Sequence, residues 1–531
     1  MKITTLLGRN AGLDRILSVF SSTVVLLVSI PLFYLVIRTY GTGPEILDIA
    51  LAPKNIAIFI NSIVLATLVT TFSALIAVPL AFLTVRTDLP WKRFWSIATA
   101  LPLVIPSYVG SFVIISAIGP KGSMIHNLLK PLGVEGLPSI YGLPGAVLAL
   151  TLFSYPYILL TVRSSLQNLD PSLEEAARNM GCSRWETFVR VTLPHIKPSI
   201  AAGGLLVALY SLSDFGTPSL MRFDSFTRAI FIQYQSSFDR STAAVLAMML
   251  VLLAFVILVL EYRSRARVNY HGASAVTKRP LPIIELGIWR TPALIFTSIV
   301  VLFALIMPLG VIVYWLFRGS FDLDFLMGLF KLCMNSVYVS GLTAVAAIIA
   351  ALPVSIYAVR YPRKLSNMLE RATYLGSGLP GVVVALSLVF FGANFATGLY
   401  QTTAMLIFAY VVLFLPKAVG TVRSSLLQVN PRLEEAARSL GSGPLETLEK
   451  VTIPLVRPGL VNGAALVFLT TMKELPATLI LSPIGFQTLA TRIWAATDDA
   501  FYAEAAVMAI FLIIASGLSM SIILKQEKAA F

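Results

Sequence analysis

The chain of 531 residues is poor in the side chains on which most soluble enzymes depend. Charged residues make up only 12% of it, about half of the share in soluble globular proteins. Its two cysteines, Cys182 and Cys333, exclude a disulfide framework and a cysteine-rich metal site. Its three histidines, His126, His195 and His271, do not stand at a metal-ligand spacing, so the sequence predicts no metal site.

Motifs for catalysis and for nucleotide binding are also missing. No G-x-x-x-x-G-K-[ST] phosphate loop occurs, so the chain is not expected to bind or hydrolyse ATP. No catalytic triad or metalloprotease pattern occurs either, so we expect neither an enzyme nor a cofactor bound by this chain. The net charge of +14 indicates orientation in a lipid bilayer rather than a nucleic-acid partner.

What the chain does have is long apolar runs. Hydrophobic residues make up 57% of it, and many runs are long enough to cross a bilayer as helices. The sequence therefore predicts an all-α polytopic membrane protein. The first run is too long for a signal-peptide core and is expected to be retained. About twelve spans are predicted, at residues 16–38, 57–83, 95–117, 141–163, 198–215, 242–261, 291–317, 333–359, 372–394, 398–420, 458–476 and 501–524.

The distribution of basic residues predicts the orientation of these spans. Most of the 40 Lys and Arg residues lie in segments that share a side of the membrane with the N-terminus. Basic loops stay in the cytoplasm, and the number of spans is even. Both termini are therefore expected to be cytoplasmic.

A polar segment is written twice in this apolar chain. Residues 161–181 read TVRSSLQNLDPSLEEAARNMG and residues 421–441 read TVRSSLLQVNPRLEEAARSLG, with 14 of the 21 positions identical at an offset of 260. Pro106 and Pro380, in spans three and nine, are related by an offset of 274. The repeat therefore extends beyond the segment, and it predicts two parallel copies of six spans.

This repeat divides the chain into three parts. Residues 1–262 form the first repeat, 263–290 a basic cytoplasmic linker, and 291–531 the second repeat. The two polar segments then lie in cytoplasmic loops, at about 165–197 and 425–457.

The polar segment has the signals of a helix–turn–helix. In the first copy Asp170 can cap a helix that begins at Pro171, and Gly181 can end it. Ser183 and Glu186 fit a capping box for a second short helix. A helix lying on lipid headgroups would explain one such loop, but not the same spacing twice.

Both copies share a longer pattern: Glu-Ala-Ala, three residues, Gly, nine residues, then apolar-x-apolar-Pro. This pattern resembles the EAA loop of ABC importer permeases. The resemblance implies a type I ABC importer permease fold in a bacterial inner membrane, in which two copies of a separate ABC ATPase subunit, which carries ATP and Mg, dock on the loops. It also implies a substrate-binding protein on the outer face. The coupling residues carried over are Glu175, Ala176, Ala177, Gly181, Glu435, Ala436, Ala437 and Gly441.

Shorter stretches indicate the substrate. Residues 213–217, 473–476 and 485–492 resemble the ferric-iron permeases, which implies Fe(III) delivered by a binding protein. Related fused permeases for thiamine or aminoethylphosphonate share much of this pattern, so these and other small solutes stay open. A secondary transporter with twelve spans would explain the topology but not the duplicated loop.

Two acidic residues are candidates for the substrate path. The offset of 260 pairs Asp214 with Glu474, at the outer ends of spans five and eleven. Ionisable groups near membrane depth are usually functional, and hard cations prefer oxygen ligands. In the alternative, both carboxylates are solvated at the outer interface or paired with Lys473 and Arg222.

Overall fold

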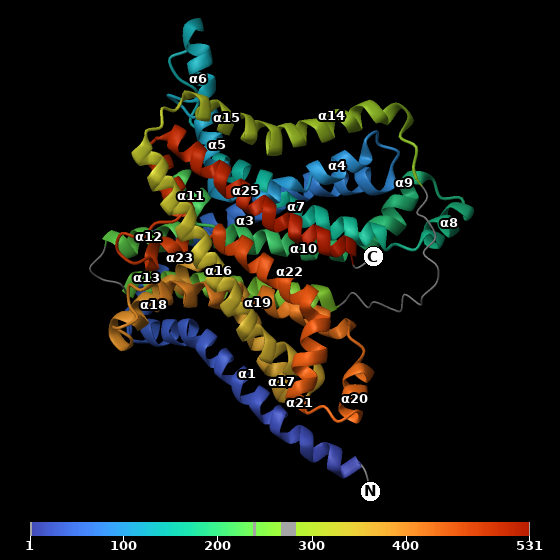
Figure 1. Ribbon diagram of the computed structural model, residues 1–531. Helices are drawn as coiled ribbons and strands as arrows, with labels where there is room; N and C mark the ends of the chain where they lie inside the picture. The colour runs from blue at the N-terminus through green and yellow to red at the C-terminus, as the bar shows by residue number, and fades with distance from the viewer. Residues whose placement is uncertain (1–2, 237–240, 267–282, 530–531) are drawn as a thin grey trace.

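The computed structural model describes residues 3–236, 241–266 and 283–529, which form a bundle of helices (Figure 1). These residues contain no strand, only an isolated β-bridge between Thr87 and Ile284. The predicted linker 263–290 falls in part outside the described residues, because 267–282 are not among them.

The main helices of the first repeat are α1 (Ile3–Tyr40), α3 (Pro53–Arg86), α4 (Lys92–Ala98), α5 (Ser107–Ile118), α7 (Leu143–Gln167), α10 (Leu193–Ser213) and α13 (Ser241–Ala266). Those of the second repeat are α14 (Arg290–Val301), α15 (Met307–Arg318), α16 (Leu323–Arg360), α17 (Lys364–Thr373), α18 (Gly381–Phe395), α19 (Thr403–Gln428), α22 (Ile453–Met472) and α25 (Tyr502–Ala529).

Short helices fill the connections. In the first repeat they are α2 (Glu45–Leu51), η1 (Leu101–Val104), α6 (Met124–Leu129), η2 (Lys130–Leu132), α8 (Pro171–Asn179), α9 (Arg184–Thr187), η3 (Phe188–Thr192), α11 (Gly216–Leu220) and α12 (Phe226–Ser236). In the second they are η4 (Gly287–Trp289), η5 (Leu302–Ile306), η6 (Tyr374–Gly378), α20 (Pro431–Ser439), α21 (Pro444–Thr447), η7 (Leu448–Thr452), α23 (Pro476–Leu481) and α24 (Leu489–Asp498).

The predicted membrane architecture is confirmed. Nine helices within the described residues are long and apolar enough to cross a membrane, and two bent helix pairs bring the number of spans to eleven. The apolar part of α25, Tyr502–Gly517, supplies the twelfth segment. The chain is therefore an all-α membrane protein with two sets of six segments.

Two of the predicted spans are wrong in shape. The spans predicted at 95–117 and 372–394 are broken, with bends of 97° and 100° between their two arms. Each bend falls just before a proline, Pro106 or Pro380, whose backbone is extended. Proline has no N–H to donate and pushes the preceding residue out of the helical region, so the helix stops there and α5 or α18 begins anew.

Each repeat has a core of three helices at equivalent positions. The first helix of each repeat packs against the other repeat. In the first repeat α7 packs against α3 and α10, and in the second α19 packs against α16 and α22. Helix α1, however, lies along α16, α17 and α18 of the second repeat (Figure 1). In return, α15 packs against α5 of the first repeat, and α14 shares a small apolar cluster with Trp95 of α4.

Candidate functional site

The first polar loop folds as a capped helix–turn–helix. Asp170 Oδ1 accepts a hydrogen bond of 2.9 Å from the backbone N–H of Ser172, which caps α8. Gly181 ends the turn at a φ of +89°, a conformation that favours glycine. Ser183 and Glu186 bond reciprocally, at 2.9 and 3.3 Å, and complete the predicted capping box.

The second loop repeats this geometry with other residues. Asn430 Oδ1 accepts from the N–H of Arg432 at 3.0 Å, and Gly441 has a φ of +101°. Glu446 accepts from the N–H of Gly443 at 3.4 Å. In one respect the structure differs from the prediction: the second short helix is not separate. It runs on through a π-helical turn, η3 or η7, into the spans α10 or α22.

Most of the predicted coupling residues lie on the surface of these loops. The exposed ones are Glu175, Ala176, Gly181, Glu435, Ala436 and Gly441. Ala177 is buried and Ala437 is half-buried, because these positions face the bundle. The Glu-Ala-Ala motif thus presents its first two positions outward and packs its third inward, in both copies.

An apolar surface lies beside the motif, and the sequence reasoning missed it. Large apolar side chains are exposed at three equivalent positions in each loop, including Met180, which is 79% exposed, and Leu440, which is 89% exposed. Clustered exposed apolar side chains mark a protein interaction surface. We call these residues the loop patches: Leu173, Met180 and Trp185 in the first loop, and Leu433, Leu440 and Leu445 in the second.

A buried ion pair holds the first loop against the spans. Arg86, the last residue of α3, forms a salt bridge with Glu174 of α8, and the arginine is only 1% exposed. Glu174 also accepts a hydrogen bond of 2.7 Å from the hydroxyl of Thr192, at the start of α10. These three residues, the first anchor, tie the loop helix to two membrane helices at once.

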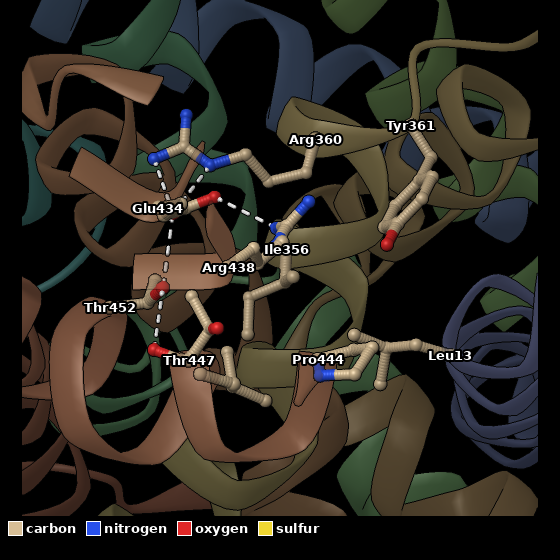
Figure 2. Close-up of a pocket in the computed structure, with 10 residues that line it drawn as sticks. Leu13, Ile356, Arg360, Tyr361, Glu434, Arg438, Pro444, Thr447 and Thr452 are labelled. Atoms are coloured by element: carbon tan, nitrogen blue, oxygen red, sulfur yellow. Dashed lines mark hydrogen bonds and ion pairs between the residues drawn. The ribbon is translucent and has the colours of Figure 1, made fainter. Parts of the chain in front are cut away.

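The second anchor is built from equivalent residues and one more (Figure 2). Arg360, the last residue of α16, donates from Nε to Glu434 Oε1 at 3.0 Å, and the hydroxyl of Thr452 donates to the same oxygen at 3.0 Å. Arg438 lies 3.6 Å from Glu434 Oε2, and Arg360 also donates to the carbonyl of Val429 at 3.4 Å. Two arginines therefore share one buried carboxylate.

The anchors could have been found in the sequence. Glu174 and Glu434 differ by 260 positions, and so do Thr192 and Thr452, while the two arginines differ by the 274 that relates Pro106 to Pro380. The motif instead led to the prediction of Glu175 and Glu435, the exposed residues next to them. A buried ion pair is specific in geometry and is costly to break, which suits a joint that must not bend.

The candidate acidic residues of the substrate path lie at equivalent positions beside the two bends. Asp214 accepts hydrogen bonds from the hydroxyl of Ser107, at the start of α5, and from the N–H of Thr217 at 2.9 Å. Its carboxylate therefore caps α11 and lies against the first residue of α5. The side chain is half-buried.

Glu474 occupies the matching place in the second repeat. Its Oε1 accepts from the N–H of Ala477 at 3.1 Å and caps α23. A Cβ at Gly381, the first residue of α18, would lie 2.4 Å from the same oxygen, so any larger residue there would displace the carboxylate. Both carboxylates thus lie at the positive ends of two helices. Within the described residues no group of three or more His, Cys, Asp and Glu side chains is placed to hold a metal ion.

Two parallel sets of six membrane segments, each with an anchored loop whose other surface is exposed, define an internally duplicated membrane transport protein. The chain belongs to the family described as the binding-protein-dependent transport system inner membrane component, which it matches over residues 134–270 and 343–526. The match has one segment in each repeat, and each segment includes the loop of that repeat.

The relatives of this chain include ferric transport permeases. The chain is 33% identical to the Fe(3+)-transport system permease protein FbpB 2 of Haemophilus influenzae, over 93% of this chain and 95% of the relative. It is 24% identical to the ferric transport system permease protein FbpB of Actinobacillus pleuropneumoniae, over 87% and 70% of the two chains. It is 26% identical to a probable ABC transporter permease of Sinorhizobium fredii, over 83% and 81%.

Proposed function

We propose that this chain supplies both halves of the permease of an ATP-driven importer of ferric iron, with a separate ATPase on its two loops and a binding protein at the opposite end. The observation that carries the proposal is the duplication of an anchored loop with an exposed surface, within a chain that resembles ferric permeases along nearly its whole length. One chain then supplies both halves of the translocation path, and it is not itself an ATPase.

The loops are built to transmit force from a docked partner. Their outer surface is apolar at the loop patches, while Glu174 and Glu434 fix their inner surface to the ends of α3 and α16. Through Thr192 and Thr452 the same carboxylates hold the starts of α10 and α22. When two ATPase subunits close on ATP, they bring the loops together, and each loop carries two spans with it. Hydrolysis lets the spans return, which gives alternating access.

The opposite end of the bundle offers a surface for the binding protein. A hollow of about 400 Å³ lies there between α11 and α12 of the first repeat and α24 of the second. Because both repeats contribute to it, a bound protein would sense their relative position. Its lining residues are Ser219, Arg222, Arg228, Phe231, Ile232, Trp494 and Asp498. We place this end outside the cell and both termini in the cytoplasm, as the basic residues indicate.

Uptake in a cell that lacks this chain tests the proposal. Labelled Fe(III), thiamine and aminoethylphosphonate are offered separately, with and without the restored gene. We expect the loss of iron uptake alone, and its return with the gene. Loss of uptake of thiamine or aminoethylphosphonate instead would keep the permease but overturn the iron assignment. Uptake that persists after ATP is depleted and collapses with the ion gradient would indicate a secondary transporter.

A further inference from the structure

A lysine in the middle of a membrane helix takes no part in the loops or anchors. Lys417 lies on α19 with an exposed side chain, although its neighbours Pro416 and Ala418 are buried. Among the described residues its ammonium has no hydrogen bond and no ion pair, and it lies 5.0 Å from the centre of the Phe414 ring. A charged group at this depth is costly, and it is retained where it serves a transported species.

A second lysine follows α22, the helix that packs against α19, and lies at the boundary between the repeats. Lys473 follows α22 and donates from Nζ to the carbonyl of Leu103 at 3.2 Å. Leu103 belongs to η1 of the first repeat, next to the bend before Pro106, so this contact joins the two halves. The packing of α19 against α22 places Lys417 and Lys473 on neighbouring segments of the second repeat. Two ammonium groups that repel each other in a medium of low dielectric are stabilised by an anion between them.

The nearby carboxylates are already engaged. Glu474 follows Lys473 directly in the chain, but its Oε1 is held by the N–H of Ala477. Asp214 is held by Ser107 and by the N–H of Thr217. Since each also lies at a positive helix end, both acids serve the backbone of the bends first. The charge left available to a transported species is therefore that of Lys417.

Only the second repeat carries this charge. The residue equivalent to Lys417 is Tyr157, whose ring packs 5.5 Å from that of Tyr210, and the residue equivalent to Lys473 is Ser213. The duplication has therefore kept the bends and the acids of both repeats but placed the two ammonium groups on one side.

We propose that Lys417 and Lys473 form an oxyanion-binding site on the translocation path, so that the transported species carries carboxylate-type or phosphate-type oxygens. The proposal rests on the importer function proposed above and narrows its substrate class. Lysine binds such groups as a point charge. A bare Fe(III) ion is repelled by two ammonium groups, whereas an iron complex with anionic oxygen ligands, or a free oxyanion, is attracted.

Equilibrium binding of labelled inorganic phosphate to the purified chain in nanodiscs tests the site directly. We expect Lys417→Met and Lys473→Met each to weaken phosphate binding about tenfold. Lys417→Arg, which keeps the positive charge, should retain binding. The matched control is Lys331→Met, which removes an exposed lysine near the start of α16 and is expected to leave binding unchanged. Equal binding by the unaltered chain and by both methionine variants overturns the proposal, provided the variants elute as single species.

Transport by the complete complex in proteoliposomes then separates the two sources of the oxyanion. The iron-loaded binding protein carries one label, and inorganic phosphate carries another. Phosphate that enters only with iron identifies the oxyanion as a ligand of the metal. Phosphate that enters without iron keeps the lysine site but shows that the ferric function is wrong. Iron transport at the unaltered rate in Lys417→Met and Lys473→Met contradicts the proposal, whichever label enters.

Discussion

The two anchors perform the same task with different amounts of support. In the first, Arg86 is almost fully buried and binds Glu174 alone, and its Nε and Nη1 atoms have no partner among the described residues. In the second, Arg360 is 13% exposed, shares Glu434 with Arg438 and also binds a backbone carbonyl. Because a buried charge depends wholly on its partner, the first anchor is the more fragile joint.

The coverings of the two anchors follow from the exchange of first helices. Beside the first anchor, the segment that leads into α14 pairs with the end of α3, where Ile284 donates from its N–H to the carbonyl of Arg86 at 2.8 Å. Over the second anchor lies α1, whose Leu13 lines a small pocket together with Arg360 and Glu434 (Figure 2). Asp14 of the same helix is bonded to Arg363 at 2.7 Å. Each loop is thus held by its own repeat and covered by the start of the other.

The largest effect is expected from Glu174→Ala. It leaves the guanidinium of Arg86 buried without its partner, which destabilises a protein by about 3–5 kcal/mol. We expect the thermal unfolding temperature in detergent to fall sharply, and transport to fall with it. The matched control is Glu175→Ala, one residue along and exposed, which changes stability by about 0.5 kcal/mol or less. Equal stability of the two variants would show that the first anchor does not hold the loop.

Glu434→Ala sharpens the comparison. Arg360 and Arg438 lose their shared partner, but Arg360 reaches solvent and keeps the carbonyl of Val429. We expect a loss of about 1–3 kcal/mol, smaller than that of Glu174→Ala, by the same unfolding measurement. A larger loss than in Glu174→Ala would reverse the ranking of the anchors.

Gly181→Val and Gly441→Val test the turns that aim the loop patches. Apart from the chain neighbours, no heavy atom of the described residues lies within 4 Å of a Cβ added at either glycine, so the cost arises from the left-handed backbone and amounts to about 1–2 kcal/mol. We expect altered loops that uncouple ATP hydrolysis from transport, measured as phosphate released per substrate moved. Gly443→Ala is the control, since its φ of −66° suits any residue. Unchanged coupling in both valine variants would remove the loops from the mechanism.

Asp14→Ala is expected to have the smallest effect. Its partner Arg363 is 64% exposed, and such pairs contribute about 0–1 kcal/mol. The unfolding temperature should therefore shift little. A loss as large as that of Glu434→Ala would mean that α1 supports the second anchor rather than merely covering it.

The sequence predicted the parts of the fold that depend on composition and local signals. Apolar runs located all twelve segments, and the capping residues Asp170 and Asn430 located the loop helices. It did not predict the bends at Pro106 and Pro380, because proline is tolerated inside other spans here, such as Pro156 in α7. Whether a proline breaks a membrane helix depends on neighbours that can satisfy the freed backbone, which one chain's letters do not reveal.

The site was predicted in the same uneven way. The turn glycines and the exposed glutamates of the motif follow from local spacing, and the structure places them at the loop surface. The arginine and the glutamate are 88 positions apart in the first anchor and 74 positions apart in the second, so only the repeated offsets indicated them. Glu174 is buried and the neighbouring Glu175 is exposed, a difference that the identity of the two residues does not predict.

Cross-linking to the ATPase subunit tests the central claim, that both loops are docking surfaces for it. Cys182 and Cys333 are first replaced by serine, and cysteine is then introduced as Met180→Cys or Leu440→Cys, at the most exposed position of each loop patch. In membranes that contain the complete complex, we predict that each variant forms a cross-link to an ATPase subunit. The absence of a cross-link from both positions, in complexes that still transport, would contradict the account.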